Sequence, residues 1–216
     1  MQYKLIIWDW NGTLIDDTWM CIEVINELLV KYSKPTLTLE AYHKVFDFPV
    51  RKYYQRIGFD FEETPFETVG SEFMDRYWQR WCECELHAGA IELIQNLKEE
   101  NIPQIIISAA ETRLIQACVE HFNIAHYFKK LCGLDHHYAT GKEGLTKECV
   151  KSVDYDPSDI LFIGDTVHDF EVARAVGVAC ILVARGHHPR YKLEKCSVPV
   201  FDSLFDVHKH IFDREG

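Results

Sequence analysis

The chain has 216 residues, of which 47% are hydrophobic and 26% are charged, and its formal net charge is -11. This length suffices for one α/β domain with a buried core and a small inserted domain. The acidic balance argues against general binding to nucleic acid or to anionic membranes, because both require clustered Lys and Arg, so we expect neither as a partner.

The first predicted element is a strand at Tyr3 to Trp8, a short apolar run that Asn11-Gly12 brings to an end. The run is too short for a signal peptide or a membrane span, and acidic residues follow it directly. We therefore expect neither, and the cysteines described below point to the cytoplasm.

The segment from about residue 17 to 84 contains no convincing strand. It shows helical patterns at Trp19 to Tyr32, Leu39 to Val45, Val50 to Ile57 and Pro65 to Cys82, and it is rich in aromatic residues. Most of these aromatic side chains are expected to form the segment's own core, and a minority could line a substrate pocket. We predict an all-helical cap domain at 17–84, inserted into a core domain formed by 1–16 and 85–216.

The rest of the chain alternates between apolar runs and helical patterns. Strands are predicted at Gln104 to Ser108, Ile160 to Ile163, Val178 to Val183 and near Val198 to Phe201. Helices are predicted at Ala90 to Glu100, Arg113 to His121, Gly144 to Val153 and His168 to Val176. Continuous apolar strands alternating with helices are typical of a parallel sheet buried on both faces. This pattern predicts a doubly wound α/β core.

The cysteines carry no recognisable framework. They are Cys21, Cys82, Cys84, Cys118, Cys132, Cys149, Cys180 and Cys196, and none forms a C-x-x-C pair. We interpret them as free or buried thiols of a reducing compartment, not as disulfide or zinc ligands.

Four groups of polar residues follow an apolar run or precede a helix. Ligands of open parallel sheets bind beyond the carboxyl ends of the strands, so these groups are expected to meet in one crevice. The first is Asp9-Trp10-Asn11-Gly12-Thr13, in which Asp9 presents a carboxylate at a strand tip. Asn-Gly is also the commonest signal for a tight hairpin turn, so this motif alone is consistent with either a turn or a reactive site.

The second group is Ser108, whose hydroxyl lies near backbone N–H groups at a predicted helix start. Such a place can bind an anion, although Ser is also a routine helix cap. The third is a lysine ahead of the Ile160 strand, either Lys142 or Lys147. We favour Lys142, which follows a glycine in a predicted loop, because Lys147 sits one turn into a helix and is typical of a solvated face.

The fourth group is Asp165 and Asp169, which follow the apolar strand that ends at Gly164. Two carboxylates four residues apart at a helix start lie on one face of the helix. Paired carboxylate oxygens are ligands that Mg²⁺ prefers. The alternative is that Asp165 caps the helix and Asp169 complements its dipole.

The order Asp, Ser, Lys and Asp-x-x-x-Asp is far more specific than any single group. These residues resemble the four motifs of the haloacid dehalogenase-like (HAD) hydrolase superfamily, and the likeness covers nearly the whole chain. The helical insert after the first motif is similar to the cap of the branch that includes phosphoglycolate phosphatases and β-phosphoglucomutases. The return from the insert to the core, Leu86-His87-Ala88-Gly89, also resembles that branch. The resemblance implies a Rossmann-like core with an inserted helical cap.

The resemblance also implies a Mg²⁺-dependent phosphatase that acts on a small phosphorylated metabolite, as a monomer or a weak homodimer. Asp9 would be the nucleophile and form an aspartyl-phosphate. Asp9, the backbone carbonyl of Asn11, Asp165 and Asp169 would hold the metal ion.

Further residues would contact the substrate. Ser108 and the N–H groups near Ala109 would hold phosphate oxygens, and Lys142 would offset the negative charge. Thr13 would support the loop beside the substrate. Arg51, in the predicted cap, could pair with a carboxylate or a second phosphate of the substrate.

Asn11 departs from the pattern of the family. Most of its phosphatases carry a second Asp there, which protonates the leaving oxygen, and general acid–base catalysis contributes roughly 10²- to 10⁴-fold. The enzyme could be slow, could prefer good leaving groups such as acyl or aryl phosphates, or could take a proton from His168, Asp16 or a cap residue. The alternative to an enzyme is a relative that binds a phosphorylated ligand or protein and turns nothing over.

Overall fold

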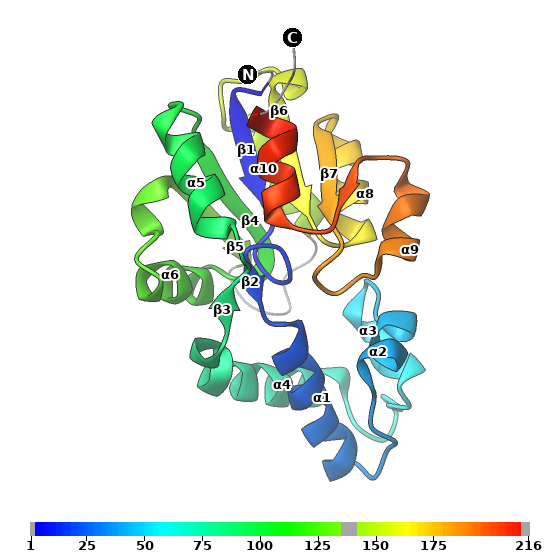
Figure 1. Cartoon of the computed structure of the whole chain (residues 1–216). Helices are drawn as coiled ribbons and strands as arrows, with labels where there is room; N and C mark the ends of the chain where they lie inside the picture. The colour runs from blue at the N-terminus through cyan, green and yellow to red at the C-terminus, as the bar shows by residue number, and fades with distance from the viewer. Residues whose placement is uncertain (1–2, 135–141, 213–216) are drawn as a thin grey trace. The chain divides into compact units, whose positions relative to one another are not determined.

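The computed structural model describes residues 3–134 and 142–212 (Figure 1). The chain divides into two compact units, one of Met1–Asp16 with Glu85–Gly216 and one of Asp17–Cys84. We call them the α/β unit and the helical unit. No helix in the described part of the chain is both long enough and apolar enough to cross a membrane.

The α/β unit is built on a parallel sheet of six strands in the order β5-β4-β1-β6-β7-β8. The strands are β1 (Leu5–Trp8), β4 (Gln104–Glu111), β5 (Phe128–Leu134), β6 (Ile160–Gly164), β7 (Ala179–Val183) and β8 (Val200–Phe201). Ile7 of β1 lies opposite Ile105 of β4 and Phe162 of β6. All residues of β1 are fully buried, as the continuous apolar run predicts for a central strand.

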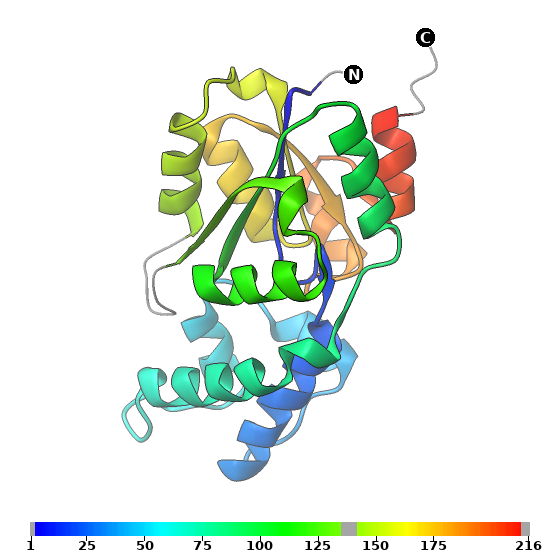
Figure 2. The same ribbon diagram turned by 90° about the vertical axis from the view of Figure 1, so that its left-hand side faces the viewer.

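Helices cover both faces of this sheet, so the predicted doubly wound α/β fold is confirmed. They are α5 (Ala90–Glu99), α6 (Thr112–His121), α7 (Lys142–Lys151), α8 (Val167–Val176), α9 (Arg190–Leu193) and α10 (Leu204–Phe212). Figures 1 and 2 show α5 and α10 against one face and α7 and α8 against the other. This winding brings the carboxyl ends of β1, β4 and β6 together at one edge of the sheet.

Two strands differ from the prediction. The edge strand β5 has no counterpart in the predicted elements, because Lys129 and Lys130 are exposed and interrupt its apolar pattern. Charged residues on an edge strand discourage pairing with another chain. The strand β4 continues past Ser108 to Glu111, with a shift in register after Ile107, where a turn was expected.

A small antiparallel pair joins the ends of the helical insert. Its strands are β2 (Ile15–Asp16) and β3 (Glu85–Leu86), with Asp16 opposite Glu85. β2 therefore does not pair across a hairpin turn at Asn11-Gly12. The partner of β2 lies almost seventy positions further along the chain, so local sequence gives no sign of it.

The helical unit contains α1 (Thr18–Lys31), α2 (Leu39–Val45), α3 (Val50–Arg56) and α4 (Phe66–Arg80). Its core is an aromatic cluster in which rings meet mainly edge to face. The ring centroids of Tyr42 and Tyr53 are 5.8 Å apart, and those of Phe46 and Tyr53 are 5.1 Å apart. The aromatic residues of the insert thus form its own core, and packing of this kind adds to the hydrophobic contribution of the buried rings.

One pair of cysteines corrects the expectation of free thiols. Cys132 on β5 and Cys149 on α7 form a disulfide, whereas the other six cysteines are free. The two residues are 17 positions apart and belong to no motif. Only the packing of α7 against β5 brings them together, and this contact could not be predicted without knowing that β5 exists.

Candidate active site

Asp9 lies at the tip of the central strand β1. Its backbone N–H donates a hydrogen bond to the carbonyl of Ile163 at 2.9 Å, which holds it level with the end of β6. Its carboxylate is almost fully buried and accepts a hydrogen bond from the ammonium of Lys142. The same ammonium donates to Asp169 Oδ1 at 2.5 Å, so a single cation bridges two buried carboxylates.

The start of α8 fixes the position of Asp169. Thr166 Oγ1 accepts a hydrogen bond from the N–H of Asp169 at 3.2 Å, and Asp169 Oδ2 accepts one from the N–H of Thr166 at 2.9 Å. This reciprocal capping box satisfies two backbone donors at the helix start. The remaining oxygen of Asp169 is left to face Lys142.

Asp165 is fully buried and is enclosed by two glycines. A Cβ atom on either Gly12 or Gly186 would collide with its carboxylate, and Gly12 also has a positive φ of 72°. Thr13 Oγ1 donates to Asp165 Oδ1 at 3.0 Å, and the N–H of His187 donates to Oδ2 at 2.6 Å. The loops after β1 and β7 therefore hold this side chain in place.

Three carboxylates form a cluster that could hold a metal ion. Oxygen atoms of Asp9, Asp165 and Asp169 all lie within 4.8 Å of one another, and all three residues are buried. The ammonium of Lys142 balances one of these three charges. When all three carboxylates are ionised, the cluster has an excess of negative charge that a divalent cation would neutralise.

The pKa values of these groups follow from burial and from Lys142. Burial raises the pKa of Asp9 to about 6, although Lys142 opposes the shift, and it raises the pKa of Asp165 well above its ordinary value. Burial acts in the same direction on Asp169, but Lys142 outweighs it and lowers the pKa of that carboxyl. Burial disfavours the charged form of Lys142, yet Asp169 and Asp9 outweigh it and raise the pKa of the ammonium.

Ser108 lies beside Asn11 because β4 pairs directly with β1. Its hydroxyl donates to Asn11 Oδ1 at 3.4 Å and accepts a hydrogen bond from the N–H of Ala110 at 3.0 Å. Ala109, between them, is half-buried. Ser108 and Asn11 thus occupy one edge of the crevice, next to the nucleophile candidate.

The sequence model of one family, described as haloacid dehalogenase-like hydrolase, matches residues 6–183. The chain belongs to this family. The match runs from β1 to the end of β7 and so contains every residue of the carboxylate cluster, together with Lys142, Ser108 and Asn11.

Curated relatives of this HAD-like hydrolase are named as phosphatases. The chain is 24% identical to phosphoglycolate phosphatase 1 of Pseudomonas aeruginosa, over 94% of this chain and 78% of the relative. It is 26% identical to N-acetylmuramic acid 6-phosphate phosphatase of Pseudomonas putida, over 88% of this chain and 86% of the relative. The two names differ in substrate and agree in the reaction.

Solved structures share the fold over nearly the whole chain. A predicted phosphatase from Clostridium acetobutylicum superposes with a TM-score of 0.84 at 23% identity, covering 99% of this chain and 100% of the other. A predicted phosphoglycolate phosphatase from Haemophilus somnus gives a TM-score of 0.79 at 21% identity, covering 98% and 99%. At these identities the likeness shows the Rossmann-like core with its helical cap.

The remaining candidates lie in different places. Lys142, the first residue of α7, reaches the cluster, whereas Lys147 is exposed on the same helix. Thr13 directs its hydroxyl at Asp165 and Asp9. Arg51 belongs to the helical unit, where its guanidinium lies 4.6 Å from the centroid of the Phe61 ring, so its contact with substrate stays a prediction.

The enclosure of Asp165 by the loop after β7 was absent from the sequence analysis. His187 contributes its backbone N–H to that carboxylate, and His188 Nδ1 accepts a hydrogen bond from the N–H of Val167 at 3.0 Å. The adjacent histidines therefore make separate hydrogen bonds. The one sequence feature that could have indicated this loop is Gly186, a glycine shortly after the apolar strand β7.

Proposed function

We propose that this HAD-like hydrolase is a Mg²⁺-dependent phosphatase that acts on a small phosphorylated metabolite through an aspartyl-phosphate on Asp9. The observation that carries the proposal is the cluster of three buried carboxylates around one ammonium at the tip of β1. A purely structural site would gain little from so many buried charges, because each of them costs desolvation energy.

The donor set fits Mg²⁺. It consists of carboxylate oxygens, which are hard ligands, and it has the excess negative charge that a divalent cation neutralises. Asp9, Asp165, Asp169 and the backbone carbonyl of Asn11 would hold the ion. When bound, Mg²⁺ shields the substrate phosphate from the carboxylates and stabilises charge on the group in transfer.

Asp9 is the proposed nucleophile. One carboxylate oxygen attacks phosphorus, the bond from phosphorus to the leaving oxygen breaks, and water later cleaves the aspartyl-phosphate to release inorganic phosphate. Lys142 keeps the Asp9 carboxylate ionised against its burial, and Thr13 donates to the other oxygen of that carboxylate. Ser108 and the backbone near Ala109 would bind phosphate oxygens at the neighbouring strand tip.

Asn11 narrows the class of substrate. Its side chain is held at the crevice by Ser108, at the position where most phosphatases of the superfamily carry an acid. An amide donates a hydrogen bond but transfers no proton at neutral pH, so it gives the leaving oxygen little help. We therefore propose a preference for phosphates with good leaving groups, such as acyl or aryl phosphates, with Arg51 as a candidate contact for a second anionic group.

The relatives support catalysis over binding alone, because those reported above are named for phosphatase activity. We further propose that the protein works in the cytoplasm, which its six free thiols support.

Release of inorganic phosphate from p-nitrophenyl phosphate and acetyl phosphate tests the proposal, with Mg²⁺ and with EDTA. We expect turnover only with Mg²⁺, and a loss of at least about 10⁴-fold for Asp9→Asn with the circular dichroism spectrum unchanged. Retained turnover in Asp9→Asn would exclude the nucleophile assignment. Absence of turnover on a broad panel of phosphorylated metabolites would favour the non-catalytic alternative.

A further inference from the structure

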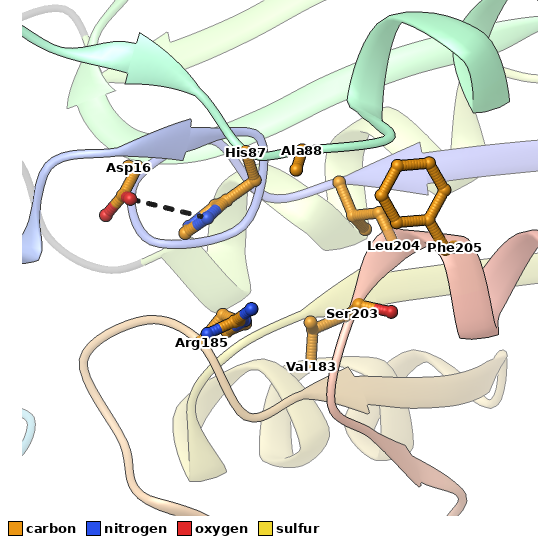
Figure 3. Close-up of a pocket in the computed structure, with 8 residues that line it drawn as sticks. All are labelled: Asp16, His87, Ala88, Val183, Arg185, Ser203, Leu204 and Phe205. Atoms are coloured by element: carbon orange, nitrogen blue, oxygen red, sulfur yellow. Dashed lines mark ion pairs between the residues drawn. The ribbon is translucent and has the colours of Figure 1, made fainter.

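The α/β unit contains a pocket of about 230 Å³ outside the carboxylate cluster. Figure 3 shows its walls coming from Asp16 of β2, the residues after β3, the end of β7 with the loop after it, and the start of α10. The side chains that matter here are those of His87, Val183, Arg185, Leu204 and Phe205. We propose that this pocket binds a small organic anion, a carboxylate or a phosphate on a short apolar group, at a site separate from the phosphoryl-transfer site.

The pocket is distinct from the crevice at Asp9. Among the described residues, its lining includes no member of the carboxylate cluster and neither Lys142 nor Ser108. The backbone at Gly12 and Gly186 lies against Asp165, while the carbonyl of Gly12 accepts a hydrogen bond from His87 and Arg185 directly precedes Gly186. These two tightly packed glycines therefore stand between the pocket side chains and the buried carboxylate.

Arg185 supplies the charge that would attract an anion. It is exposed, lines the pocket, and has no hydrogen bond or ion pair within the part of the chain that the structure describes. Arg190, five residues later, is instead neutralised by Asp202 at 3.0 Å and by Glu194 at 3.2 Å. One arginine of this loop thus stabilises the fold, while the other presents an unpaired guanidinium, whose planar fork suits carboxylate and phosphate oxygens.

The only carboxylate among the residues that line the pocket is turned toward a different partner. Asp16 Oδ2 lies 3.8 Å from Nδ1 of His87, as the dashed line in Figure 3 marks. The opposite ring nitrogen, Nε2, carries a proton, because the carbonyl of Gly12 at 3.1 Å can only accept a hydrogen bond. His87 is thereby oriented with its Nδ1 facing Asp16. Among the described residues no ion pair joins Asp16 to Arg185, so the guanidinium is available to an external anion.

The apolar residues of the pocket determine which group the ligand carries besides its anion. Val183 and Leu204 are buried at the base, whereas the ring of Phe205 is 45% exposed and packs over Gly89. The hydroxyl of Ser203 is already engaged, since it donates to Asp206 Oδ2 at 2.6 Å and caps α10. A ligand would therefore gain its polar contact from Arg185 and its apolar contact from Phe205. The volume admits only a few non-hydrogen atoms besides the anionic group.

Isothermal titration of the full chain with malonate, benzoate and methylphosphonate tests this site, because none of these anions has a phosphoester bond to hydrolyse. We expect saturable binding of at least one of them, weakened about tenfold or more by Arg185→Gln. Arg185→Lys keeps the charge without the planar fork and should give an intermediate affinity. Arg174→Gln removes the same charge from the exposed end of α8, outside the pocket, and should leave the affinity within about twofold of the wild type.

Three results would overturn the proposal. They are the absence of saturable binding for all three anions, equal weakening by Arg185→Gln and Arg174→Gln, and loss of malonate binding in Lys142→Gln, which changes the carboxylate cluster and leaves the pocket lining intact. The last result would assign the anion to the phosphoryl-transfer site. Equal thermal midpoints of the wild type and Arg185→Gln serve as the folding control. Because binding needs no turnover, the outcome does not depend on whether the proposed phosphatase activity is found.

Discussion

The α/β unit and the helical unit differ in where their ion pairs lie. The α/β unit buries charged side chains in its carboxylate cluster, whereas the helical unit keeps them at the surface around its aromatic cluster. In the α/β unit, Asp9, Asp169 and Lys142 form ion pairs with side chains that are less than a tenth exposed. In the helical unit, ion pairs such as Arg80 with Glu23 lie at the surface, with side chains 22% and 55% exposed, over a core of packed rings.

This difference leads us to expect that the aromatic core determines stability, whereas the carboxylate cluster is the part proposed to react. Surface ion pairs contribute about 0–1 kcal/mol each, so the stability of the helical unit rests on its aromatic core. Buried carboxylates cost desolvation energy, which appears in the raised pKa values of Asp9 and Asp165. A fold tolerates that cost where the charges perform chemistry, so variants of the two clusters should fail in different assays.

After the loss expected for Asp9→Asn, the largest effect is expected for Lys142→Gln. Lys142→Gln removes the one ammonium that faces Asp9 and Asp169, and we expect kcat/KM for phosphate release to fall about 10²- to 10³-fold. Lys147→Gln is the matched control, because Lys147 is exposed on the same helix. Equal losses in the two variants would mean that the charge of α7, and not the contact with the carboxylates, matters.

In the helical unit, we expect the damage to appear in stability. Tyr54 is 3% exposed and packs against Phe59 and Phe66, so Tyr54→Ala should lower the free energy of unfolding by about 3–5 kcal/mol. Tyr191→Ala, on α9, removes a side chain that is 51% exposed and should change stability by less than about 0.5 kcal/mol. Denaturant titration followed by circular dichroism measures both, and a similar loss in the two variants would contradict the assignment of the aromatic core.

A gain of function is expected at Asn11. Asn11→Asp introduces a proton donor beside the proposed nucleophile and should raise turnover about tenfold or more on a phosphomonoester with a poor leaving group. The gain should be smaller on p-nitrophenyl phosphate, whose leaving group needs little protonation. Steady-state turnover of the wild type and Asn11→Asp on both substrates tests this prediction. Equal gains on the two substrates, or no gain, would show that the missing proton donor at position 11 does not limit turnover.

The smallest expected effect concerns pH. In the metal-free fold the pKa of Asp9 is about 6, above its ordinary value, so ionisation of Asp9 lowers stability as the pH rises through that range. If Asp9 is a ligand, as proposed, Mg²⁺ binds its ionised form and should reverse this loss. The gain in Tm on adding Mg²⁺ should therefore be larger at pH 7.5 than at pH 5, with an affinity several-fold higher at pH 7.5. An equal gain at both values would contradict the placement of Asp9 among the ligands.

The parts of the site that the sequence predicts are those carried by continuous apolar strands. The runs that became β1 and β6 are followed by Asp9 and end in Gly164-Asp165, so the sequence shows each strand together with the candidate residue at its tip. The choice between Lys142 and Lys147 also followed from local pattern. The segment 135–141, which was read as the loop before Lys142, lies outside the described residues.

What could not be predicted depends on contacts between distant segments. The edge strand β5 carries Lys129 and Lys130, and a strand open to solvent needs no apolar run. The disulfide of Cys132 and Cys149 depends in turn on β5. The enclosure of Asp165 requires the loops after β1 and β7 to lie next to each other. No local sequence pattern predicts that these two loops are close in space.

The short β2–β3 pair holds the two ends of the helical insert next to each other. Asp16 and Glu85 lie opposite each other, so the chain leaves the α/β unit and re-enters it at adjacent residues. An insert with neighbouring ends can be shortened, lengthened or exchanged for another while the sheet keeps its register, since closing a loop costs free energy that grows only slowly with loop length. The pairing of Asp16 with Glu85 thus makes the junction of the helical segment independent of that segment's length.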